Sequence, residues 1–210
     1  MIYDISPAIT EHLPVWPGDT PPRREVLLDL ERGDSVTLST LHATVHLGAH
    51  ADGANHYGRG APGVEALRIE DYLGPCQLIR VAARPGTRVA IEDLPASIET
   101  PRVLICTRTF PDPSGAAAGF ARDFAALEPA LVDHLHARGV RLIGIDTPSV
   151  DLFDSKELPA HRRFLANGMG ILEGLVLAEV PEGVYELIAL PLKLVGFDAS
   201  PVRAVLRDLP

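Results

Sequence analysis

Short apolar runs, separated by turns rich in proline and glycine, dominate the chain. Residues 36–47 alternate between polar and apolar side chains, which predicts a strand with one buried face. Runs rich in Val, Ile and Leu are typical of strands buried on both faces, and they cover residues 77–83, 103–107, 141–145 and 171–177. Further strands are predicted at residues 2–6, 24–30, 185–190 and 202–206.

Helix signals are fewer. Residues 64–73 are predicted to form a helix that ends at Gly74 and Pro75. Pro129 at a first helical position and Gly139 just past the end bracket a second helix. Residues 155–161 are predicted to form a polar turn. Because strands outnumber helices, we expect an α/β or α+β fold, with a mixed β-sheet scaffold and flanking helices, in a single domain spanning residues 1–210.

The most unusual polar pattern contains three histidines and one aspartate, all at even offsets from the first: His46, His50, Asp52 and His56. An extended chain places such residues on one face, whereas a helix would separate them. A straight strand would hold the first and last too far apart for one site. The chain must therefore bend, and Gly48 and Gly53 lie where bends cost little. The strand at residues 36–47 is expected to deliver His46.

Imidazole nitrogens and carboxylate oxygens are ligands that suit zinc, manganese or iron(II). The absence of a nearby cysteine excludes a cysteine-rich structural zinc site. Two histidines and one carboxylate leave coordination positions open for water, as a catalytic metal requires. The alternative is a polar loop with solvated histidines. His42 would share a face with His46, but we favour a solvated or hydrogen-bonded ring there.

Glu173 is a second signal, because it lies inside the apolar run 171–177. A buried, ionised carboxylate is costly unless it is paired with a cation or binds a metal. No Lys or Arg lies within several residues, so a metal ligand is favoured over a tertiary salt bridge, and His161 is the natural companion. Two metal ions are then predicted, one held by His46, His50 and Asp52, the other by Asp52, His161 and Glu173.

Two further residues are candidates for chemistry and binding. Water activated by paired metals could attack an amide or ester carbon. His56 would lie beside the metals with a pKa suited to proton transfer near neutral pH, or else act as an additional ligand. Trp16 is the only tryptophan, in the Pro/Gly-rich loop 13–22, and is either a packing anchor or the aromatic wall of a substrate pocket.

Composition narrows the class of protein. A hydrophobic fraction of 46% supports a packed core, and a net charge of −9 disfavours nucleic acid and offers no polybasic membrane patch. No apolar segment reaches the length of a membrane span and no signal peptide is recognisable, which predicts a cytoplasmic protein. Cys76 and Cys106 are expected to be buried free thiols. No Gly-x-Ser-x-Gly elbow is present, which removes the serine-hydrolase route.

The pattern His46-x-Gly-x-His50-x-Asp52-x-x-x-His56 resembles the signature of the cyclase-type metal-dependent hydrolase family. Supporting stretches extend over nearly the whole chain, at residues 15–20, 145–151, 155–158, 171–174 and 198–205. Within that family the chain is similar to the arylformamidase branch, which tends to have alanine at the position of Ala49. The usual turn between the aspartate and the last histidine contains a proline. This chain has Gly53 and Ala54 there instead, which makes the turn less rigid.

This resemblance implies a swivelling β/β/α fold, a homodimer and two zinc ions on the residues proposed above. It also implies that His56 is the proton donor and acceptor and that Trp16 contacts the substrate. The implied reaction is hydrolysis of N-formyl-L-kynurenine to L-kynurenine and formate. A related hydrolase that opens a cyclic amide such as isatin, and a metal-binding protein without turnover, are the alternatives. The native metal stays open among zinc, manganese and iron(II).

Overall fold

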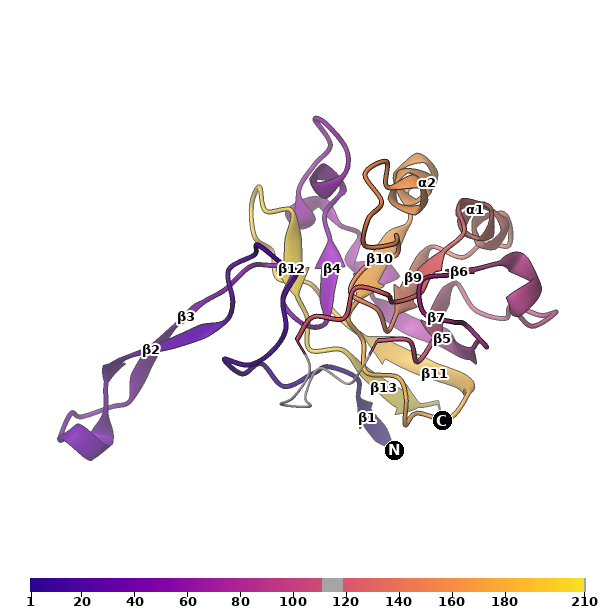
Figure 1. Cartoon of the computed structure of the whole chain (residues 1–210). Helices are drawn as coiled ribbons and strands as arrows, with labels where there is room; N and C mark the ends of the chain where they lie inside the picture. Colours follow the sequence, from indigo (N-terminus) through magenta and orange to yellow (C-terminus); the bar gives the residue numbers. More distant parts are fainter. Residues whose placement is uncertain (111–118, 210) are drawn as a thin grey trace.

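The central element of the computed structural model, which describes residues 1–110 and 119–209, is a nine-stranded mixed sheet. The strands follow one another across the sheet as β1 (Ile2–Asp4), β13 (Val205–Asp208), β11 (Gly183–Ile188), β5 (Leu73–Arg80), β7 (Arg102–Cys106), β9 (Leu142–Ile145), β10 (Gly170–Glu173), β4 (His50–Asp52) and β12 (Ala199–Pro201). The sheet curls into a half-barrel, and helices α1 (Pro129–Ala137) and α2 (Pro159–Asn167) lie together on one side of it (Figure 1).

The middle of the sheet is parallel, from β5 through β7 and β9 to β10. Its side chains alternate between two apolar cores, as the pleat requires. Leu104 and Leu172 belong to the core on one face, whereas Ile105 and Ile145 pack on the other face with Phe164 of α2. Burial on both faces explains why these strands read as continuous apolar runs. The predicted α+β architecture, with a mixed sheet and flanking helices, is confirmed.

A two-stranded arm projects from the body and consists of β2 (Arg23–Leu28) and β3 (Leu38–His42), joined through a 3-10 turn, η1 (Leu30–Arg32) (Figure 1). The prediction of one strand over residues 36–47 was therefore wrong at its end. The ladder ends at the Arg23–His42 pair, and beyond it the Thr44 amide donates to the Thr20 carbonyl in the segment that enters the arm. His42 contacts Glu25 on the arm at 2.7 Å, the hydrogen-bonded role favoured for it.

The predicted helix at residues 64–73 is also wrong, because two 3-10 turns, η3 (Val64–Ala66) and η4 (Ile69–Asp71), precede β5. Leu67 and Arg68 take up extended backbone between the two turns, and this interrupts the helix. The polar turn predicted at 155–161 is wrong from Pro159, where α2 begins. The strand predicted at 202–206 begins only at Val205. Smaller elements are η2 (Ala54–His56), β6 (Arg88–Val89), η5 (Ile91–Asp93) and β8 (Ala126–Leu127).

Neither α-helix has the length or the apolar character needed to cross a bilayer, and the same holds for every helix in residues 1–110 and 119–209.

Both cysteines are buried and free, as predicted. Burial raises the pKa of the Cys76 thiol to about 12 and that of the Cys106 thiol to about 11. Because the thiolate is the reactive form, we expect Ellman's reagent at pH 8 to label neither residue in the native protein and both in denaturant. Rapid labelling of the native protein would contradict this burial.

Candidate metal centre

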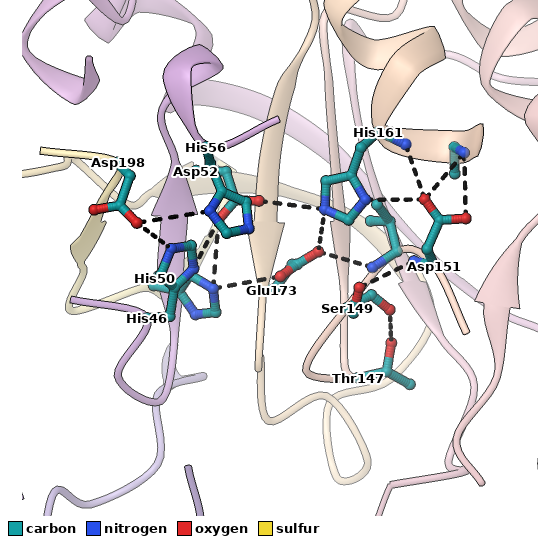
Figure 2. Close-up of polar contacts among 12 residues, drawn as sticks. His46, His50, Asp52, His56, Thr147, Ser149, Asp151, His161, Glu173 and Asp198 are labelled. Atoms are coloured by element: carbon teal, nitrogen blue, oxygen red, sulfur yellow. Dashed lines mark hydrogen bonds and ion pairs between the residues drawn. The ribbon is translucent and has the colours of Figure 1, made fainter. Parts of the chain in front are cut away.

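The five predicted metal ligands converge at the end of β10, from elements far apart in the sequence: His46, His50, Asp52, His161 and Glu173 (Figure 2). Glu173 pairs with His50 across β10 and β4, and His50 and Asp52 share a face of β4. The first turn of α2 brings His161 over the same face. The side chain of His46 arrives from the segment that links the arm to the body, not from a strand.

The two carboxylates lie between the rings (Figure 2). Asp52 Oδ1 is 3.3 Å from His46 Nδ1 and 3.5 Å from His50 Nε2, whereas Asp52 Oδ2 is 3.5 Å from His161 Nε2. Glu173 approaches His50 Nε2 at 3.3 Å with one oxygen and His161 Nε2 at 3.5 Å with the other. Each carboxylate therefore faces histidines on two sides, the geometry of a bridging ligand.

The second nitrogen of each ring is occupied by the protein. His50 Nδ1 contacts the Gly48 carbonyl at 2.8 Å, and His161 Nδ1 contacts Asp151 Oδ2 at 2.9 Å. His46 Nε2 contacts Asp198 Oδ2 at 3.1 Å. A ring nitrogen that donates its hydrogen outward leaves the other nitrogen free to bind a metal, which is the usual arrangement of metal-binding histidines.

Unsatisfied polar atoms at the centre support a metal site. His50 Nε2 and both oxygens of Asp52 are buried without a hydrogen-bond partner in the described structure. Such atoms are costly unless something else satisfies them. Two groups of residues each have ligand atoms that lie within 4.8 Å of one another. One group is His46, Asp52 and His56, and the other is His50, Asp52 and Glu173. Asp52 belongs to both groups, so these residues fit a metal centre, and the division into two ligand sets stays a prediction.

The charges in the cluster are strongly coupled. Burial alone would raise the pKa of Asp52, but contacts with His161 and His46 outweigh it and hold this pKa well below its usual value. Burial alone would lower the pKa of His46, but Asp52, with help from Glu173, raises it to about 9. The cluster thus keeps its carboxylates ionised in a buried place, as metal binding requires, whereas a metal would have to displace a proton from His46.

Two aspartates contact the histidines of the cluster, and neither was identified from the sequence as a site residue. Asp151 is the first. It accepts hydrogen bonds from the Ala160 amide at 3.0 Å and the His161 amide at 3.1 Å, which caps α2. Arg88 donates to it at 3.0 Å. The usual capping signal is an acid directly ahead of a helix, whereas Asp151 lies nine residues before Ala160, so spacing gave no clue.

The second missed acid is Asp198, which lies ahead of β12 and contacts the turn that carries His56. The Gly53 amide donates to the Asp198 carbonyl at 2.8 Å, and the His56 amide donates to the Gly53 carbonyl at 3.0 Å. The turn without proline is therefore held by hydrogen bonds. The ring of His56 lies 4.2 Å from that of His46, and its side chain is 35% exposed.

A cavity of about 330 Å³ opens onto the cluster. The histidines and Glu173 form its polar end, and Trp16, Phe110 and Phe120 form an aromatic wall. Trp16 stacks on Phe153 with 4.8 Å between ring centroids and meets Phe120 edge-on at 5.3 Å. Trp16 is thus both a packing anchor and part of the cavity wall, the two roles that its sequence context left open.

Gly174 allows the end of β10 to approach Gly48, whose carbonyl orients His50. A Cβ on Gly174 would overlap the Gly48 carbonyl oxygen, whereas at Gly168, with similar backbone, it would meet nothing within 4 Å. We expect Gly174→Ala and Gly168→Ala each to lose about 1 kcal/mol of stability from left-handed backbone strain, and Gly174→Ala to lose more because its methyl group must displace the Gly48 carbonyl.

Only Gly174→Ala should also weaken zinc binding, by roughly 10- to 100-fold, as loss of a histidine's orienting partner does. Thermal unfolding and zinc titration of both variants measure this. Equal zinc affinity of the two variants would show that the Gly48 carbonyl tolerates the displacement.

A curled mixed sheet that carries a buried His/Asp/Glu cluster beside a cavity fits a metal-dependent hydrolase fold. Residues 3–152 match the family described as "Putative cyclase", and the chain belongs to this Cyclase family.

Solved structures agree with that assignment. A potential metal-dependent hydrolase with cyclase activity is 29% identical, with a TM-score of 0.83 over 98% of this chain and 96% of that chain. A predicted metal-dependent hydrolase from Bacillus stearothermophilus is 30% identical, with a TM-score of 0.79 over 98% and 97%. Isatin hydrolase A from Labrenzia aggregata is 21% identical, with a TM-score of 0.79 over 98% and 91%, and shares the fold.

Proposed function

We propose that this protein is a metal-dependent amidohydrolase that converts N-formyl-L-kynurenine and water to L-kynurenine and formate. The cavity carries this proposal, because aromatic side chains and the histidines and Glu173 of the candidate metal centre line the same space. An aryl ring suits that wall, and a formyl group is small enough to lie beside the cluster. The sequence resemblance to the arylformamidase branch supports the same substrate.

The residues divide into three roles. His46, His50, Asp52, His161 and Glu173 would hold two zinc ions, although manganese and iron(II) suit the same ligands. When bound, the metals would supply Lewis acidity toward the formyl carbonyl and toward a water molecule. Trp16 stacks against the aryl ring and excludes water from that side. His56 accepts a proton from the attacking water and donates it to the departing amine nitrogen, while the carbon–nitrogen bond breaks.

A cyclic amide is the second candidate substrate, because isatin hydrolases share the fold and isatin is also a flat aryl amide. Purified protein loaded with zinc should consume N-formylkynurenine in an absorbance assay and release one formate per turnover. Faster turnover of isatin would assign the chain to ring opening. Bound metal without turnover of either compound would indicate a metal-binding protein, and elemental analysis of the purified protein identifies the native metal.

We also propose that the arm pairs two copies of the chain, the homodimer that the resemblance implies. A two-stranded hairpin is marginally stable alone, yet Leu38 and Leu41 are 49% and 59% exposed on this one. Replacing both with serine should shift the mass measured by light scattering from two chains toward one. Ile69→Ser, also 59% exposed but in the body, is the matched control. A dimer that survives the arm substitutions would place the interface elsewhere.

A further inference from the structure

Asp198 contacts two histidines of the site with one oxygen. Its Oδ2 lies 3.1 Å from His46 Nε2 and 3.6 Å from His56 Nδ1, between rings whose centroids are 4.2 Å apart (Figure 2). The first contact is a hydrogen bond, whereas the second is too long for one and brings only the charge of the carboxylate close to His56. Among the described residues, Asp198 is the hydrogen-bond partner of His46 Nε2.

The hydrogen that the His46 ring donates determines which of its nitrogens can bind a metal. With Nε2–H directed at Asp198, His46 turns Nδ1 toward Asp52 Oδ1, 3.3 Å away, on the side of the metal cluster. Without this carboxylate, the His46 ring could take either tautomer or rotate.

The backbone around Asp198 is clamped to the segment that carries His56. The Gly53 amide donates to the Asp198 carbonyl at 2.8 Å, and the Asn55 side-chain amide donates to the Gly196 carbonyl at 3.3 Å. Glu65 accepts from the Gly196 amide at 2.9 Å. The loop is therefore fixed by bonds that do not involve the Asp198 carboxylate, and the carboxylate can be removed without releasing the loop.

We propose that Asp198 is a positioning residue that orients His46 for metal binding. The metal affinity that this predicts does not rest on the proposed function. The test therefore uses binding and spectroscopy, which need no turnover.

The first measurement is zinc affinity, by competition with a fluorescent chelator. We expect Asp198→Ala to bind zinc roughly 10- to 100-fold more weakly than wild type, the usual cost of losing a histidine's outer partner. Asp198→Asn should lose less, because its amide oxygen still accepts an N–H. Glu65→Gln, which alters the same loop away from the histidines, should bind as wild type. Wild-type affinity in Asp198→Ala, or an equal loss in Glu65→Gln, would overturn the proposal.

The second measurement is the nitrogen-15 NMR spectrum of the histidine rings in the zinc-loaded protein, with His46→Ala assigning the His46 signals. Wild type should show His46 protonated at Nε2 and zinc-bound at Nδ1, and Asp198→Ala should show a mixture of ring states. Unchanged His46 signals in Asp198→Ala would contradict the orienting role. A wild-type protein with the expected His46 signals that fails to hydrolyse N-formylkynurenine refutes the proposed function alone.

Discussion

Asp52→Asn will remove metal binding and hydrolysis together, because Asp52 belongs to both groups of residues that could hold a metal. Its oxygens lie within 3.5 Å of His46, His50 and His161. The asparagine keeps the shape, but it loses the charge and presents an amide nitrogen that cannot bind a cation. We expect zinc affinity to fall more than about 100-fold, because losing a metal ligand costs more than losing a residue that only orients a ligand.

Elemental analysis after dialysis and a chelator competition measure this loss, and the formamide assay measures activity. The fold should survive, because the two apolar cores are separate from this cluster. Asp154→Asn, an exposed acid in the loop ahead of α2, is the matched control and should keep both metal and activity. Two tightly bound zinc ions in Asp52→Asn would rule out Asp52 as the shared ligand.

Local sequence rules were sufficient for the part of the site that lies on one segment. His50 and Asp52 share a face because strand side chains alternate, and Gly48 supplies the bend at a φ of +58°. Glu173 was recognisable because a carboxylate in an apolar run needs a partner. These inferences depend on chain geometry and burial, which a single sequence displays.

Contacts between distant segments set the rest, and no local pattern encodes them. Asp151 and Asp198 act through histidines that lie 10 and 152 residues away in the chain. The strand expected at 36–47 stops at His42, where its partner strand β2 begins at Arg23. The helix expected at 64–73 is interrupted where Leu67 and Arg68 take up extended backbone. In both cases a weak local preference is overridden by the way the whole chain packs.

His56→Ala will lower kcat by roughly 100- to 10,000-fold, the range that a positioned acid–base group contributes. KM should change little, because the aromatic wall that holds the substrate is untouched. Zinc content should stay at the wild-type value if His56 transfers protons, whereas loss of one zinc would make it a ligand of the group with His46 and Asp52. His136→Ala, on the exposed end of α1, is the control and should match wild type.

The pH profile provides an independent check on the same histidine. Partial burial lowers the pKa of His56 below its ordinary value of 6.5. This effect outweighs the negative charge of Asp52, which alone would raise the pKa. The ring is then neutral at pH 7 and able to accept a proton, and it becomes protonated only as the pH falls below 6.5. The acid limb of kcat/KM should therefore lie below pH 6.5 in wild type and vanish from the residual activity of His56→Ala. An acid limb that persists unchanged in that variant would assign the essential base to another group.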